Sequence, residues 1–218
     1  MRFENAYKGI GNIITAEVLS IIATVTGVLT AVFGAVAYAA EMEKIKEVLD
    51  YTIGGFTILG IITLVLLALS FIINIIGLAK AGKDDSEFVK ALVEILIAVV
   101  ALAAGVYFDG KNDLIKTVCN AILSVVNTIV MMHVVNGIAN LADKMFNSKM
   151  INKGKTVTIL IMVAFGLKAL AEIVLKFFFK DPKANINVIL SLVSALAQII
   201  QYLFYIGYLG KARKMLRA

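Results

Sequence analysis

The stretch from Tyr51 to Ala79 constrains the fold of this chain more than any other feature of its sequence. Its 29 residues include no Asp, Glu, Lys, Arg or His. About 20 apolar residues in a helix, at about 1.5 Å each, cross the hydrocarbon core of a bilayer. The whole chain is 61% hydrophobic, whereas soluble domains are nearer to about 45–50% apolar. The sequence therefore predicts a transmembrane helix in a membrane protein.

Two more such runs follow, and a less perfect apolar run precedes each of the three. We predict an all-α membrane protein with six transmembrane helices in a single domain that covers residues 1–218. The predicted spans are approximately 12–39, 52–79, 88–108, 115–140, 156–177 and 187–210. Short polar connectors are expected between them.

The first run also resembles a secretory signal peptide, because a basic start precedes an apolar stretch. The uncharged part, residues 18–40, is much longer than the apolar core of a signal peptide, which has about 7–15 residues. We therefore expect a retained first helix.

Lys and Arg are distributed unevenly between the two predicted sides of the membrane. One side has the N-terminus, residues 80–90 and 143–155 and the tail, and it carries 13 Lys and Arg against 7 on the other. Because basic residues are enriched on the cytoplasmic side, both termini are predicted to be cytoplasmic in a cell membrane. This bias explains most of the net charge of +6. No basic cluster alternates with aromatic residues, so nucleic acid is not an expected partner.

Glycines recur at corresponding places in the predicted helices. The second, fourth and sixth runs end near Gly77, Gly137 and Gly207, and the odd-numbered runs each have a glycine about ten residues into the membrane. We predict three pseudo-repeated helical hairpins, since internal repeats are common in transport folds. The alternative is chance similarity between apolar sequences built from few residue types.

Within the predicted spans, apart from the first and last two residues of each, charged residues lie in the odd-numbered helices. They are Glu17, Lys90, Glu94, Lys168 and Glu172. A charge that faces lipid costs several kcal/mol, so such groups face protein or water. The odd helices are therefore predicted to form an inner layer and the even helices a lipid-facing layer.

Glu17 and Glu94 are predicted to lie at similar depths from the cytoplasmic side. Two carboxylates at one depth could bind a cation or share a proton. The alternative is that each pairs with a nearby lysine, such as Lys8 or Lys90, or reaches water at the membrane interface. Lys90 and Glu94 are four residues apart and are expected to touch.

Lys168 is the charge nearest to the middle of a predicted span, about 18 Å from its cytoplasmic start. It either pairs with Glu172, four residues on, or faces inward and binds an anionic group. His133, the only histidine, is predicted to lie deep in the fourth span. Asn127 belongs to a polar stripe on the same span, which either lines a wet path or bonds neighbouring helices. The other members of this stripe are Asn120, Ser124 and Asn136.

These residues favour transport or conduction of a small solute or ion, because ionisable groups inside a membrane often mark a pathway. The alternative is a structural or partner-binding subunit of a membrane complex or homo-oligomer. An intramembrane enzyme is the third class. No catalytic, metal or cofactor motif supports it. Cys119 and His133 are 14 residues apart on one predicted helix, about 21 Å, which is too far for a nucleophile and its base. The expected partners are the lipid bilayer, other membrane subunits and a second copy of the chain.

Overall fold

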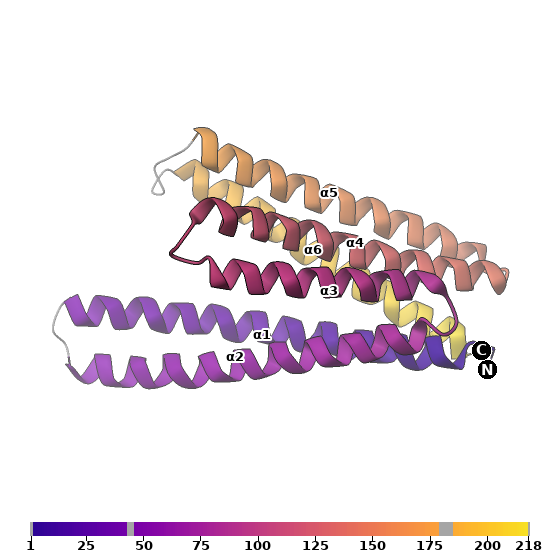
Figure 1. The fold of residues 1–218 in the computed structure, drawn as a ribbon, viewed down its shortest axis with the longest axis horizontal. Helices are drawn as coiled ribbons and strands as arrows, with labels where there is room; N and C mark the ends of the chain where they lie inside the picture. Colours follow the sequence, from indigo (N-terminus) through magenta and orange to yellow (C-terminus); the bar gives the residue numbers. More distant parts are fainter. Residues whose placement is uncertain (1, 43–45, 179–184, 218) are drawn as a thin grey trace. The chain divides into compact units, whose positions relative to one another are not determined.

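The computed structural model describes residues 2–42, 46–178 and 185–217. In these ranges all regular structure is α-helical, without strands, and the order of helices follows the order of the predicted spans (Figure 1). The six helices are α1 (Glu4–Met42), α2 (Lys46–Ala81), α3 (Ser86–Tyr107), α4 (Asp113–Lys144), α5 (Ser148–Phe178) and α6 (Asn185–Arg217).

Five helices contain a described run that is long and apolar enough to cross a membrane. These runs are Glu4–Gly34, Tyr51–Ala81, Ser86–Tyr107, Leu114–Lys144 and Ser148–Leu170. The sixth predicted span lies in α6, where many side chains are outside the described part, and it stays a prediction.

The apolar surface of α2 is largely uncovered. No residue in its most apolar window is buried, and side chains such as Ile58 and Leu64 are 61% and 68% exposed. Removing apolar surface from water stabilises a protein by about 25 cal/mol per Å². Contact with lipid would remove this surface from water. The helices are therefore compatible with an integral membrane protein.

The chain forms two compact units, which we call the small unit (residues 11–77) and the large unit (residues 1–10 and 78–218). In the small unit, α1 and α2 are joined by hydrogen bonds between small polar side chains. The hydroxyl of Thr63 donates to the hydroxyl of Thr26 at 2.8 Å, and the hydroxyl of Ser70 donates to the carbonyl of Ala16 at 2.8 Å. Such bonds are a common means of helix association in membranes.

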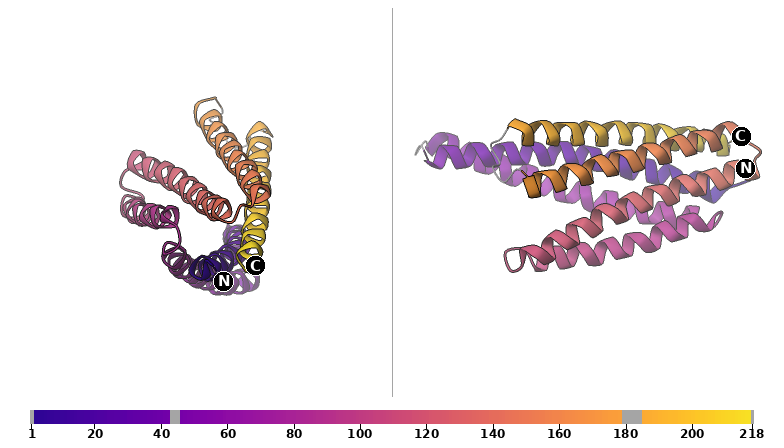
Figure 2. Two further views of the ribbon diagram at one scale, coloured as in Figure 1. Left: turned by 90° about the vertical axis from the view of Figure 1, so that its right-hand side faces the viewer. Right: turned by 90° about the horizontal axis from the view of Figure 1, so that it is seen from above.

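In the large unit, α4 packs against both α3 and α5, and α5 also packs against α6. α4 and α5 diverge from the short turn that joins them (Figure 2). That the even-numbered helices form a lipid-facing layer stays a prediction. The prediction used only full charges, whereas α4 turns uncharged polar side chains and His133 towards its neighbours.

The core of the large unit is concentrated where α3 and α5 begin and α4 and α6 end. Its largest fully buried side chains include Phe88, Val134, Ile138, Leu141, Ile161, Tyr205, Leu209 and Leu216. The first turns of α1 and the last turns of α6 meet at this end, where the Arg213 guanidinium lies 4.9 Å from the centre of the Tyr7 ring.

Several helices extend beyond the predicted spans. α5 begins at Ser148 rather than near residue 156, and only residues 145–147 separate it from α4. The side chain of Asn147 accepts a hydrogen bond from the backbone N–H of Met150 at 3.1 Å and so caps α5. A lysine ends a membrane span because hydrocarbon excludes its charge. It does not end the helix, because Lys is a good helix former.

The predicted connector at residues 40–50 is also mostly helical, since α1 continues to Met42 and α2 begins at Lys46. Residues 43–45 lie outside the described part, as do residues 179–184 of the predicted connector between the last two helices. The predicted C-terminal tail is helical to Arg217.

The turn between α3 and α4 has the residues that a tight reversal needs. Gly110 has a φ of 69°, a left-handed conformation that glycine adopts without strain. Asn112 caps α4 by accepting a hydrogen bond from the N–H of Ile115 at 3.1 Å. Lys116 hydrogen-bonds to Asp109, and this bond together with the lysine charge lowers the pKa of Asp109.

Candidate functional site

A small polar pocket lies between α4, α5 and α6 of the large unit, and we call it the α4–α6 pocket. Its volume is about 90 Å³. It is lined by Ser124, Asn127, Thr128, Met131, Ala164, Phe165, Lys168, Gln201 and Tyr202. The structure thus brings together two predicted site residues, Asn127 and Lys168, which the sequence had placed on separate helices.

The spacing of residues along α4 explains one wall of this pocket. Ser124, Asn127 and Thr128 lie three and four residues apart, so they share a helix face. The Thr128 hydroxyl donates to the carbonyl of Ser124 at 2.9 Å. This wall is the middle part of the predicted polar stripe.

α6 adds an amide to the pocket. Gln201 Nε2 lies 3.3 Å from Met131 Sδ. A thioether is only a weak acceptor, so the amide can exchange this contact for a stronger one. The wall from α6 is therefore able to bind a polar molecule.

The size and charge of the α4–α6 pocket limit what it can hold. A water molecule takes about 30 Å³ in the liquid, so 90 Å³ accommodates a few waters or one small ion. Lys168 is half-buried and contributes the charged group of the described lining. The lining therefore offers one ammonium and several uncharged polar groups to a small solute.

The alternative partner for Lys168, Glu172, lies on α5, but its side chain is outside the described part. Pairing of Lys168 with Glu172 therefore stays a prediction.

His133 lies on α4, within the run Leu114–Lys144 that is long and apolar enough to cross a membrane. Its Nδ1 lies 2.7 Å from Glu87 Oε2, in the first turn of α3, and Lys90 Nζ lies 2.5 Å from the other oxygen of that carboxylate. An ionised carboxylate only accepts hydrogen bonds, so Nδ1 carries the proton. The sequence did not predict this partner, because Glu87 was assigned to a connector.

The predicted contact between Lys90 and Glu94 is wrong, because the ammonium of Lys90 binds Glu87. Glu94 is half-buried on α3. Lys8, the suggested partner of Glu17, binds Glu4 at 2.5 Å. Glu17 belongs to the small unit and Glu94 to the large unit, so a joint cation or proton site stays a prediction.

Two aspartates that sequence reasoning missed join the helix ends of the large unit, and we call them the Asp84–Asp85 junction. The carboxylate of Asp85 is buried and accepts hydrogen bonds from the N–H of Glu87 at 3.1 Å, the amide of Asn140 at 3.2 Å and the ammonium of Lys144 at 3.1 Å. Asp85 thus caps α3 and binds the end of α4.

Asp84 makes the corresponding connection to α1. It accepts hydrogen bonds from the backbone N–H of Ala6 at 2.7 Å and from the amide of Asn5 at 3.2 Å. Both donors lie in the first turn of α1, where backbone N–H groups have no partner within the helix. The signal in the sequence was an Asp followed by Ser86 and Glu87, which is a pattern typical of a helix start.

No family model, curated protein or solved structure matches this chain. Among the described residues, no group of three or more His, Cys, Asp and Glu side chains could hold a metal ion. The site must therefore be interpreted from its own geometry.

Proposed function

We propose that this chain is a six-span protein of the cell membrane with both termini in the cytoplasm, and that the α4–α6 pocket serves transport or conduction of a small anion or polar solute. The observation that carries this proposal is the placement of Lys168 in one pocket with the amides of Asn127 and Gln201. Burying a cation is costly unless polar groups or a ligand compensate it. A polar lining around such a cation is what a solute pathway needs.

Two further observations support the proposed topology. The contact between Tyr7 and Arg213 brings the first and last helices together at one end of the large unit, as an even number of spans requires. The excess of Lys and Arg on that side favours a cytoplasmic location.

We also propose the three pseudo-repeated helical hairpins, but the surroundings of the corresponding glycines do not support them. A Cβ added at Gly137 would lie 2.7 Å from the ring of Phe88, whereas one at Gly207 would meet no atom within 4 Å. The two glycines therefore have different surroundings, although their positions in the sequence correspond.

The alternative function is a structural or partner-binding subunit of a membrane complex or homo-oligomer. The Asp84–Asp85 junction favours it, because there the polar side chains join helices rather than line an opening. An intramembrane enzyme is the third class, and no specific geometry supports it.

Flux through the purified protein in liposomes tests the proposal, with chloride and nitrate as probe anions and potassium as the probe cation. We expect anion flux that is lost in Lys168→Met and reduced in Asn127→Leu, because the pocket then lacks its charge or its amide. Lys168→Arg should retain most of the flux.

Leu167→Met is the matched control, since Leu167 is the exposed neighbour of Lys168 on α5. It should behave as the unmodified protein. Absence of flux for all probes, or equal flux in Lys168→Met with the fold intact, would contradict the pathway and favour the structural alternative.

A further inference from the structure

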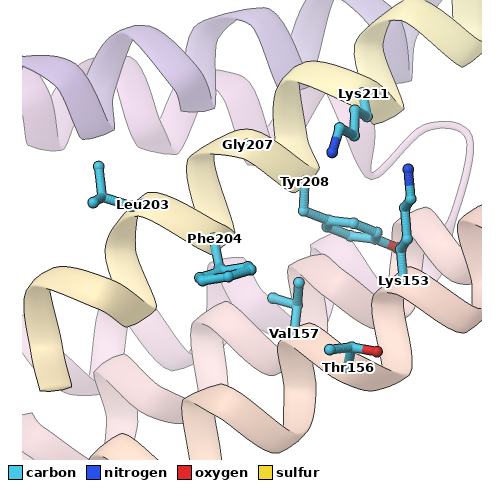
Figure 3. A pocket seen from close by; sticks show the side chains of 8 residues that line it. All are labelled: Lys153, Thr156, Val157, Leu203, Phe204, Gly207, Tyr208 and Lys211. Carbon is cyan, nitrogen blue, oxygen red and sulfur yellow. The ribbon is translucent and has the colours of Figure 1, made fainter.

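A second and larger pocket lies between α5 and α6, and we call it the lysine pocket (Figure 3). Its volume is about 430 Å³, which is within the range of sites for small molecules, about 300–1,000 Å³. Lys153 and Lys211 lie at one end, Leu203 and Phe204 lie at the other, and the ring of Tyr208 forms a wall between them.

The charged end of the lysine pocket has two ammonium groups, those of Lys153 and Lys211. Lys153 extends from α5 and Lys211 from α6, and the two side chains point towards one another (Figure 3). They are close enough for their charges to repel, and Lys149 adds to this repulsion. In the described ranges, neither Lys153 nor Lys211 forms an ion pair with a carboxylate. A bound anion would relieve the repulsion.

The other end of the lysine pocket is apolar and open. Leu203 and Phe204 are 64% and 54% exposed. Leu203 and Lys211 are eight positions apart in the sequence, which corresponds to about 12 Å along α6. One end of the pocket is therefore suited to a negative charge, and the other end, about two turns away, to a hydrocarbon chain.

We propose that the lysine pocket binds an anionic phospholipid, with the headgroup phosphate between Lys153 and Lys211 and the start of an acyl chain against Leu203 and Phe204. The apolar end favours a lipid over free phosphate, which would leave that surface uncovered. Basic pockets between membrane helices on the cytoplasmic side bind anionic headgroups in this way. The lipid site does not depend on a transport function.

Native mass spectrometry of the full chain in detergent tests this site. The probes are phosphatidylglycerol and phosphatidylcholine with the same acyl chains, and inorganic phosphate. We expect phosphatidylglycerol to bind more tightly than phosphatidylcholine, and its affinity to fall about 30-fold in Lys153→Gln/Lys211→Gln, from the contribution of two lysines near a membrane surface.

Lys155→Gln/Lys214→Gln is the matched control, because it removes the same charge from exposed positions on the same two helices. It should keep its affinity for phosphatidylglycerol, and so should Lys153→Arg/Lys211→Arg. Equal binding of the two lipids, or an equal loss in the control, would overturn the proposal. Displacement of phosphatidylglycerol by millimolar inorganic phosphate would also overturn it, since the site would then be one for a free anion.

Discussion

At the scale of single residues, the buried carboxylate of Asp85 has more hydrogen bonds than an N-cap requires. Besides the N–H of Glu87, it binds the amide of Asn140 and the ammonium of Lys144. One side chain therefore caps the start of α3 and holds the end of α4, and its removal leaves three donors without their acceptor.

We predict that Asp85→Ala lowers the free energy of unfolding by about 2 kcal/mol. Loss of an N-cap costs about 1 kcal/mol, and loss of the hydrogen bonds to Asn140 and Lys144 adds a similar amount. Unfolding of the purified chain in detergent, followed by circular dichroism, measures the change.

Asp143→Ala is the control for this substitution, because Asp143 is exposed near the end of α4. Its effect should be within about 0.5 kcal/mol of zero. Equal free energies of unfolding for the two variants would show that the Asp84–Asp85 junction stabilises the fold no more than an exposed carboxylate does.

At the scale of helices, close packing between α3 and α4 depends on a position without a side chain. A Cβ added at Gly137 would lie 2.7–3.0 Å from three atoms of the fully buried Phe88 ring. The glycine therefore has a packing role that is independent of any left-handed backbone conformation, since it lies within α4.

We predict that Gly137→Ala destabilises the large unit by about 1–3 kcal/mol, the usual cost of overpacking. Gly166→Ala, on α5, should instead be neutral or stabilising by up to about 1 kcal/mol, because no described atom beyond its chain neighbours and the nearby helix backbone lies within 4 Å of its Cβ position, and alanine favours helix. Thermal unfolding in detergent measures both.

Replacing Phe88 by Leu in the Gly137→Ala chain should restore part of the lost stability, because the smaller side chain makes room for the methyl group. Additive effects of the two substitutions would contradict a direct contact between these positions.

The helices also show which parts of the structure the sequence could predict. Uncharged runs predicted the number and order of the helices, because hydrocarbon excludes charge. They did not predict the ends of α5 or α1, because Lys149 and Glu41 are excluded from hydrocarbon and not from a helix.

The candidate site was predictable only in part. Lys168 and Asn127 were singled out by polarity, but the side on which α6 packs, and so the presence of Gln201, depends on contacts between distant residues. The same limit applies to His133, whose partner Glu87 lies 46 residues away. The helical periodicity and the polarity of the sequence identify such residues, but they do not identify the residues that these contact.

At the scale of the whole molecule, both proposals depend on how the large unit lies in the membrane. The lysine pocket needs the end of α6 at the inner membrane surface, where anionic lipids are enriched. The α4–α6 pocket needs α4 and α5 to cross the membrane. Orientation of the large unit is thus the property on which the functional proposals rest.

Labelling of single cysteines with a membrane-impermeant maleimide measures this orientation directly. In a chain with Cys119 replaced by Ala, Lys111→Cys places a thiol on the exposed turn between α3 and α4, and Lys149→Cys places one on the exposed first turn of α5. We predict that Lys111→Cys is labelled in intact cells and that Lys149→Cys is labelled only after the membrane is permeabilised. Labelling of both thiols in intact cells, or the reverse pattern, would contradict the proposed topology.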